Sequence, residues 1–137
     1  MQIKFQLEKG AYKPTKAHDT DAGFDLYATE DQKGSSSIID TKVHILIPKG
    51  YVGLIFPRSS MSKRGFITPT GVIDAGYTGT VKVKLDYMGT DNETHYYAGE
   101  RIAQLVIVKI PEIELVEGNV LEEETERGDG GFGSTGR

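Results

Sequence analysis

The sequence has no cysteine among its 137 residues, and it has no apolar stretch long enough to cross a membrane. The absence of cysteine excludes disulfides, thiolate metal sites and cysteine nucleophiles. A membrane-spanning helix needs about 18 consecutive apolar residues, and the alternating residues that follow Met1 are unlike those of a signal peptide. We therefore expect a soluble, cytoplasmic protein that makes no membrane contacts.

Basic residues are too few for a protein that binds nucleic acid directly. Lysine and arginine total 16 against 20 aspartates and glutamates, which gives a net charge of −4. Binding to a phosphate backbone depends on clustered positive charge, so we expect no direct nucleic-acid partner. A small nucleotide is still compatible, because a few local arginines suffice to hold its phosphates.

Helical spacing is nearly absent, and apolar residues instead alternate with polar ones. Alternation of period two and short apolar runs that stop at proline both predict β-strands. Predicted strands cover residues 3–7, 43–47, 51–56, 81–87 and 102–110, with a last short strand at Ile113 and Leu115. The 17 glycines favour many turns. We predict an all-β sandwich, jelly roll or barrel in a single domain over residues 1–120.

The one predicted helix is a short segment over residues 59–64. Ser59 or Ser60 would cap its N-terminus, and Gly65 would follow its C-terminus. Arg58 directly precedes the segment, so a guanidinium, two hydroxyls and helix amides meet at one point. This combination predicts either an anion site or a simple helix cap beside a solvated arginine.

Residues 71–79, GVIDAGYTG, predict a β-hairpin with glycine on both arms. The exposed backbone of such a hairpin could read the edge of a base without side chains. The alternative is an ordinary turn, in which Asp74 caps its own backbone. Taken alone, the segment favours the ordinary turn.

Two further segments also allow two interpretations. Asp21 and Asp25 flank a glycine, and one of them could support a divalent cation on a polyphosphate, although aspartates beside glycine are more often turn formers. Gln104 either holds a phosphate oxygen or faces solvent on its strand. We expect structural or surface roles for the histidines, which lack the spacing of zinc ligands: His18, His44 and His95.

Residues 121–137 differ in composition from the rest of the chain. The segment starts with four glutamates in six residues and ends in the glycine-rich RGDGGFGSTGR. Such a sequence cannot bury a core, so we expect an arm that is disordered unless a ligand or partner orders it. Phe132 offers a flat ring, and Arg127, Ser134 and Thr135 offer donors for phosphate. The arm is therefore suited to close over a nucleotide.

Taken in order, five segments resemble the five motifs of the trimeric dUTP pyrophosphatase (dUTPase) family: AGFDLYA (22–28), PRSSMSKRG (57–65), GVIDAGYTG (71–79), GERIAQLVI (99–107) and RGDGGFGSTG (127–136). The order and spacing agree over nearly the whole chain. The resemblance implies a jelly-roll-like β-barrel subunit and a homotrimer with C-terminal arm exchange. It also implies magnesium-dependent hydrolysis of dUTP to dUMP and diphosphate, which limits uracil incorporation into DNA and supplies dUMP for dTMP synthesis.

The resemblance also implies roles for the residues of the predicted hairpin. Asp74 matches the aspartate that activates the water attacking the α-phosphorus. Tyr77 matches the tyrosine that lies under the deoxyribose and rejects ribose sterically. Uracil would be read by backbone at Gly71, Val72 and Ile73, and across the hairpin near Lys82.

Phosphate, magnesium and lid roles follow from the other four motifs. The residues that match phosphate contacts are Arg58, Ser59, Ser60 and Gln104. Asp25 matches the carboxylate that holds magnesium through water. In the arm, Phe132 would stack on uracil and Arg127 would neutralise the γ-phosphate. The clamp would be completed by Gly133, Ser134 and Thr135.

Two positions depart from the family pattern, and two other functions stay open. Ser60 stands where many relatives have glycine, and Thr68 stands where many have an asparagine that contacts uracil, so backbone would read uracil O4 here. A dCTP deaminase of the same fold would need a glutamate to shuttle protons, whereas the hairpin offers Asp74 and Tyr77. A non-catalytic nucleotide sensor is the second alternative. A regulatory protein partner would use surface outside the motifs, such as residues 90–97.

Overall fold

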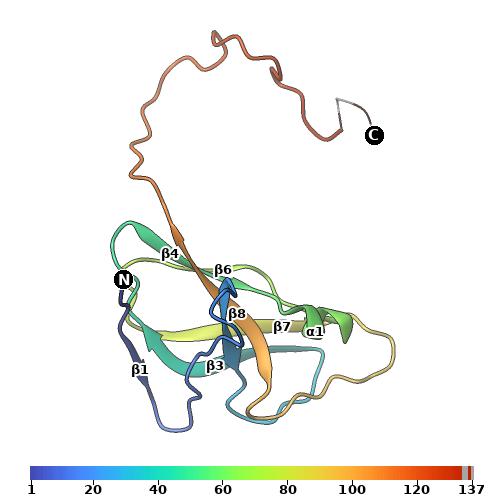
Figure 1. Ribbon diagram of the computed structural model, residues 1–137. Coiled ribbons are helices and arrows are strands. Elements are labelled where there is room, and N and C mark those ends of the chain that lie inside the picture. Colours follow the sequence, from blue (N-terminus) through green and yellow to red (C-terminus); the bar gives the residue numbers. More distant parts are fainter. Residues whose placement is uncertain (134–135, 137) are drawn as a thin grey trace.

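The computed structural model describes residues 1–133 and residue 136, and it is nearly all β (Figure 1). The described strands are β1 (Phe5–Leu7), β2 (Gly23–Tyr27), β3 (Ser36–Ile45), β4 (Tyr51–Phe56), β5 (Phe66–Ile67), β6 (Gly71–Ile73), β7 (Thr80–Tyr87) and β8 (Arg101–Lys109). One short helix, α1 (Ser59–Lys63), lies between β4 and β5. Across residues 1–133 and 136, no helix combines the length and apolar character needed to span a membrane.

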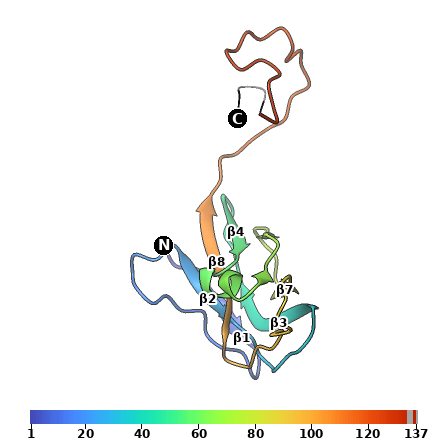
Figure 2. The same cartoon turned by 90° about the vertical axis from the view of Figure 1, so that its right-hand side faces the viewer.

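The strands form two four-stranded sheets, and every strand pair is antiparallel. The first sheet has the order β1-β3-β7-β5, and the second has the order β2-β8-β4-β6. Both sheets contribute to one hydrophobic core, since Val83 of β7 and Leu105 of β8 are each 1% exposed. Figure 2 shows the sheets at right angles to the first view, with the chain beyond β8 leading away from them. The all-β, jelly-roll-like prediction is confirmed.

The alternation read from the sequence sets the two faces of the sheets. Along β7, Val81, Val83 and Leu85 are buried, while the lysines between them are exposed. A strand with one apolar face is stable only when that face meets another layer. Alternation predicted β1 and β7, and apolar runs that stop at proline predicted β4 and β8, all within a few residues of their observed bounds.

Two predictions about strands are wrong. No strand follows Lys109 in the part of the chain that the structure describes, so Ile113 and Leu115 form no last strand. This segment has no neighbouring strand with which to pair, and a lone strand has no hydrogen-bond ladder. The arms of the predicted hairpin also do not pair with each other: β6 pairs with β4, and β7 pairs with β3 and β5. Residues 74–79 are a loop that crosses from one sheet to the other.

Helix α1 is a single turn close to its predicted position. Its buried anchor is Met61, which is 2% exposed. Gly65 follows the C-terminal cap with φ +98°, which confirms its predicted place. The predicted serine cap is wrong, because the N-cap residue is Arg58 and no side chain caps the helix. The hydroxyl of Ser60 instead accepts a hydrogen bond from Arg58 Nη1 at 3.1 Å.

Candidate functional site

Strands β2 and β8 of the second sheet, together with the residues just after β4, bring polar side chains together on its outer face. Asp25 of β2 lies opposite Gln104 of β8, which lies opposite Phe56 of β4. Residues opposite one another share a face, and this face is the outer one because the following residues, Leu26 and Leu105, are in the core. We call the hollow here the anion pocket. It measures about 280 Å³ and is lined by Ala17, Asp21, Ala22, Gly23, Asp25, Arg58, Ser59, Arg101 and Gln104.

Asp25 holds two arginines in place inside the anion pocket. Its Oδ1 lies 2.9 Å from Arg58 Nε, and its Oδ2 lies 3.6 Å from Arg101 Nη1. Arg58 Nη1 also donates to the Arg101 carbonyl oxygen at 3.2 Å. The carboxylate is 14% exposed, so these contacts are partly shielded from solvent. The two guanidinium groups are therefore positioned before any ligand binds.

Charge in the anion pocket is balanced within this chain. Two arginines line it, and so do two aspartates, Asp21 and Asp25. Asp21 Oδ2 accepts a hydrogen bond from the His18 amide at 2.9 Å, which is the turn-forming role expected of an aspartate beside glycine. Asp25, by contrast, lies within a strand and faces the arginines. A polyphosphate would therefore need positive charge from outside these side chains.

Gln104 is held at the wall of the anion pocket. Its Nε2 donates to the Pro57 carbonyl oxygen at 3.0 Å. A Cβ added at Gly23 would lie 2.5 Å from Gln104 Oε1, so only glycine leaves room for this side chain. Gln104 is half-buried rather than solvent-facing, and one amide N–H is still available to a ligand.

A second hollow lies where the crossing loop leaves β6 and enters β7. We call it the loop pocket. It measures about 380 Å³ and is lined by Ile55, Gly71, Val72, Ile73, Asp74, Tyr77, Thr80, Val81 and Lys82. The structure thus brings together the hairpin residues that the sequence singled out, although the two strands belong to different sheets.

The loop is a tight turn that fixes the position of Tyr77. The Tyr77 amide donates to the Asp74 carbonyl oxygen at 3.2 Å, and Gly76 has φ +82°, as the third position of a type II turn requires. The Tyr77 hydroxyl donates to the Thr80 carbonyl oxygen at 3.1 Å. The ring lies so close to Gly79 that an added Cβ there would sit 2.2 Å from the hydroxyl oxygen. Tyr77 is still 44% exposed, so part of this residue is accessible to a ligand.

Lys82 closes one side of the loop pocket and lies beside an acidic group. Its Nζ donates to Thr80 Oγ1 at 2.9 Å, and its strand position is opposite Asp40 of β3. Burial would raise the pKa of Asp40, but the Lys42 amide, the Thr80 hydroxyl and the lysine charges lower it below its usual value. Asp40 is therefore an anion that offsets the charge of Lys82.

The two pockets open on opposite sides of the second sheet. The anion pocket lies on the outer face, with Asp25 and Gln104. The loop pocket is lined by Ile55 and Ile73, whose side chains belong to the core. Successive side chains of a strand point to opposite faces, and the two pockets share no lining residue.

The described part of the chain beyond β8 leads away from the two sheets (Figures 1 and 2). Phe132 is fully exposed. Arg127 Nε donates to the Gly130 carbonyl oxygen at 2.9 Å, a contact within the arm itself. The structure therefore does not bring Arg127, Phe132 or Gly133 to the body, and the predicted contacts of Ser134 and Thr135 lie outside the described residues.

Sequence reasoning missed Arg101, the second arginine of the anion pocket. Strict alternation along β8 would turn Arg101 to the opposite face from Gln104. However, Ala103 pairs with Leu26 and Arg101 pairs with Tyr27, so the ladder skips Ile102. This β-bulge turns Arg101 back to the outer face. The sequence feature that could have identified Arg101 is its position in the GERIAQ segment, which also contains Gln104.

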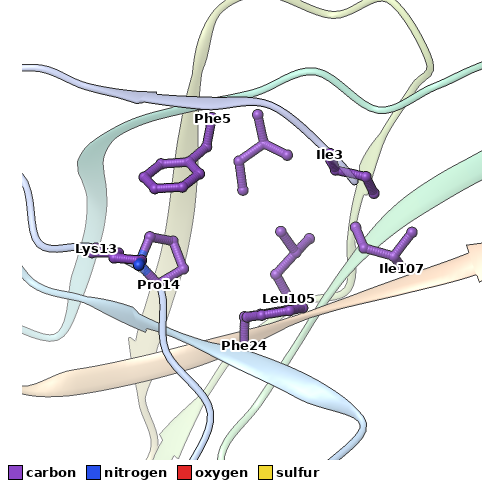
Figure 3. A pocket seen from close by; sticks show the side chains of 8 residues that line it. Ile3, Phe5, Lys13, Pro14, Phe24, Leu105 and Ile107 are labelled. Atoms are coloured by element: carbon purple, nitrogen blue, oxygen red, sulfur yellow. The ribbon is translucent and has the colours of Figure 1, made fainter. Parts of the chain in front are cut away.

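An apolar pocket beside β1 was also missed (Figure 3). It measures about 200 Å³ and is lined by Ile3, Phe5, Lys13, Pro14, Phe24, Ile45, Leu105 and Ile107. Phe5 and Phe24 are each more than a third exposed, and lysine ammonium groups lie over both rings. The pocket contains none of the predicted site residues.

Together the fold and pockets define an all-β protein with a pre-positioned arginine pair and a separate pocket containing an aspartate and a fixed tyrosine. The family model described as dUTPase matches residues 10–136. Two curated relatives are the deoxyuridine 5′-triphosphate nucleotidohydrolases of Mycobacterium leprae (strain TN) and Mycobacterium tuberculosis (strain ATCC 25618 / H37Rv). They are 41% and 40% identical to this chain, and the match covers 96% of this chain and 92% of each relative. The chain belongs to the dUTPase family.

Solved structures agree with this assignment. The Staphylococcus bacteriophage 80alpha dUTPase with dUpNHpp is 33% identical, with a TM-score of 0.87 and 99% of both chains covered. A variant dUTPase from phage phi11 of S. aureus, described for its coordination of a structural Mg(II) ion, is 27% identical. Its TM-score is 0.78, with 90% of this chain and 100% of that chain covered.

Proposed function

We propose that this chain hydrolyses dUTP to dUMP and diphosphate, the reaction of the dUTPase family, at sites shared between the subunits of a homotrimer. The observation that carries the proposal is the loop pocket, where Asp74 and Tyr77 lie in one turn beside the backbone of β6. Asp74 would accept a proton from the water that attacks the α-phosphorus. Positioning and charge stabilisation would supply most of the rate, as in phosphoryl transfer generally.

The free edge of β6 supports recognition of uracil by backbone. β6 is the last strand of its sheet, so one row of its N–H and C=O groups is not used by the sheet. The groups at Gly71, Val72 and Ile73 can pair with the edge of a base. Thr68 lines another hollow, with Phe66 and Met88, and is 6% exposed. Its side chain does not line the loop pocket, which leaves the reading of uracil O4 to backbone.

Tyr77 would select deoxyribose over ribose. Its hydroxyl is tied to Thr80 and its ring is backed by Gly79, so the ring cannot easily move aside. A ring that fills the space next to C2′ excludes a 2′-hydroxyl sterically. Tyr77 is 44% exposed, and its ring would lie under the sugar.

The anion pocket would hold the phosphates, with Arg58, Ser59, Ser60 and Gln104 in the roles that the motifs imply. Because its arginines are balanced by aspartates, a triphosphate needs further positive charge. Magnesium and Arg127 of an arm would supply it. Both oxygens of Asp25 face guanidinium groups, and no three histidine, aspartate or glutamate side chains gather among the described residues. This arrangement fits a magnesium ion held mainly by phosphates and water, with Asp25 acting through water.

Two features of the single chain support a shared site. The loop pocket and the anion pocket open on opposite faces of one sheet, and the arm leads away from both. Large apolar side chains are also exposed on the body and in the segment after β8: Ile67, Val72, Met88, Ile113, Leu115 and Val116. We propose that neighbouring copies cover this surface. One copy would provide the loop pocket, a neighbour the anion pocket, and an arm (residues 121–137) the lid with Phe132 on uracil and Gly133, Ser134 and Thr135 at the phosphates.

The decisive experiment measures diphosphate release with dUTP, dCTP, dTTP and UTP side by side, with and without magnesium. We expect rapid release from dUTP alone and a strong dependence on magnesium. Ammonia release from dCTP would instead indicate a deaminase. Tight dUTP binding without turnover would indicate a nucleotide sensor, and comparable turnover of UTP would remove the sugar-selective role of Tyr77.

A further inference from the structure

His44 bridges two segments that are far apart in the sequence. It lies on β3, opposite Thr80 of β7 and Gln6 of β1. Its Nδ1 is 2.7 Å from the Thr78 carbonyl oxygen, and its Nε2 is 2.8 Å from Glu8 Oε1. Thr78 directly follows Tyr77, so the histidine contacts the loop next to the ring proposed to lie under the sugar.

The chemistry of the two contacts favours the protonated form of His44. A carbonyl oxygen only accepts hydrogen bonds, so Nδ1 must carry a proton toward Thr78. A neutral ring protonated at Nδ1 would turn a lone pair at Nε2 toward the Glu8 carboxylate, which also only accepts. Both short contacts are satisfied together when the ring is an imidazolium that donates from both nitrogens.

The loop has few other ties to the body. Among the residues that the structure describes, the Gly76 amide donates to the Ile47 carbonyl oxygen at 3.2 Å, and His44 is the side chain from outside the loop that bonds its backbone. A shift of register between Asp40 and His44, where Lys42 has φ +57°, changes the alternation of β3. Such a bulge re-aims the side chains that follow it.

We propose that His44 is a positioning residue: protonated and held by Glu8, it fixes the loop at Thr78 and thereby holds Tyr77 in place for the sugar of the substrate. The kinetic test of this inference rests on the proposed dUTP hydrolysis, whereas the contacts of His44 do not depend on it. His44 does not line the loop pocket and would touch no reacting atom.

The proposal predicts a dependence on pH. The hydrogen bond to the Thr78 carbonyl raises the pKa of His44 above its ordinary value of 6.5, and the hydrogen bond and charge of Glu8 raise it further, against a smaller opposing effect of burial. The charged groups that act on the ring are Glu8 after β1 and Asp40 on β3. Because the pKa is raised in the folded state, the bridge is complete at low pH and is lost as pH rises through that pKa.

Two variants distinguish the effect of the charge on His44 from the effect of its hydrogen bonds. His44→Ala removes both contacts, and we expect the KM for dUTP to rise about 2- to 10-fold, the worth of one or two hydrogen bonds, with kcat nearly unchanged. Glu8→Gln lets a neutral His44 accept from the new amide while still donating to Thr78. We therefore expect Glu8→Gln to keep the low KM and to remove most of the rise in KM as pH increases through the raised pKa of His44. His95→Ala, at a histidine outside both pockets, is the matched control and should behave as wild type.

The measurements are KM and kcat for dUTP and UTP across pH, with an NMR titration of the His44 and Tyr77 ring signals in nucleotide-free protein. The proposal requires that the Tyr77 ring signals shift at the same pH at which His44 titrates. This shift should be absent in His44→Ala. An unchanged KM and unchanged Tyr77 signals in His44→Ala would overturn the proposal, as would a loss confined to kcat. If wild type fails to turn over dUTP, the proposed function fails, and the NMR titration still decides whether His44 holds the loop.

Discussion

Two glycine-rich segments of this chain each carry one aromatic residue, yet they differ in how they are held. The loop at residues 74–79 carries Tyr77, which is hydrogen-bonded to Thr80 and packed against Gly79. The arm carries Phe132, which is fully exposed, and its hydrogen bonds at Arg127 and Gly130 stay inside the arm. Glycine content therefore does not decide order. Contacts with the neighbouring strands do.

The difference suits two stages of one reaction. A loop that is fixed before binding costs little entropy when the substrate arrives, so it can select base and sugar. If the arm closes over the bound nucleotide as proposed, it must lose conformational entropy at each closure. That cost weakens its contribution to binding but lets it open again to release product.

The largest expected effect comes from the loop. Asp74→Asn removes the proposed base and keeps the size of the side chain, so kcat should fall about 100- to 10,000-fold. Binding of a non-hydrolysable dUTP analogue should stay close to wild type, because the backbone of β6 and Tyr77 are untouched. Single-turnover kinetics and calorimetry measure the two quantities. Normal turnover in this variant would exclude Asp74 as the base.

Removal of the arm should have the next largest effect. Deleting Gly128 to Arg137 takes away the stacking of Phe132 on the base, and base–aromatic stacking is worth about 10- to 100-fold in binding or rate. The described residues after Gly128 make no hydrogen bond to the body, so the melting temperature and the proposed trimer should be unchanged. Sedimentation and thermal melting check this. Full activity of the truncated chain would mean that the arm is not a catalytic lid.

A matched pair of glycine substitutions, one in the loop and one in the arm, tests the comparison between these two segments directly. In Gly79→Ala the new Cβ would lie 2.2 Å from the Tyr77 hydroxyl oxygen, so the ring must move. We expect kcat/KM for dUTP to fall roughly 10-fold, since misplacement by a full ångström can cost about 100-fold. In Gly131→Ala the new Cβ meets nothing within 4 Å, so the change should be nearly silent in thermal melting. If Gly79→Ala and Gly131→Ala changed the melting temperature equally, the contrast between a loop held by its contacts and an arm whose described residues make no hydrogen bond to the body would be contradicted.

The sequence predicted those parts of the fold that depend on local pattern. Alternation identified β7, and apolar runs that stop at Pro57 and Pro111 identified β4 and β8 near their observed ends. It did not reveal β2, because aspartates around Gly23 are typical of turns. It also mispaired β6 with β7, because the partner of a strand depends on contacts between distant residues, which no local pattern contains.

The functional site likewise contains residues that the sequence predicted and residues that it did not. The motifs around Asp74, Arg58 and Asp25 were found because their residue types suit phosphate and base chemistry. Arg101 was missed because a bulge at Ile102 changes its face. The bond between His44 and the loop was missed because Glu8, His44 and Thr78 are separated in sequence and meet only after β1, β3 and β7 align.

Thr68 provides the smallest expected effect and tests a position where many relatives carry asparagine. Its side chain is 6% exposed, and its Oγ1 has no hydrogen-bond partner among the described residues. A buried hydroxyl without a partner costs about 1–3 kcal/mol. Thr68→Val keeps the shape and removes the hydroxyl, so it should raise the free energy of unfolding by about 1 kcal/mol and leave dUTP turnover unchanged. Chemical denaturation measures the first quantity. A loss of stability in Thr68→Val would mean that the hydroxyl gains a partner in the assembled trimer, and the same variant would then also weaken assembly in sedimentation.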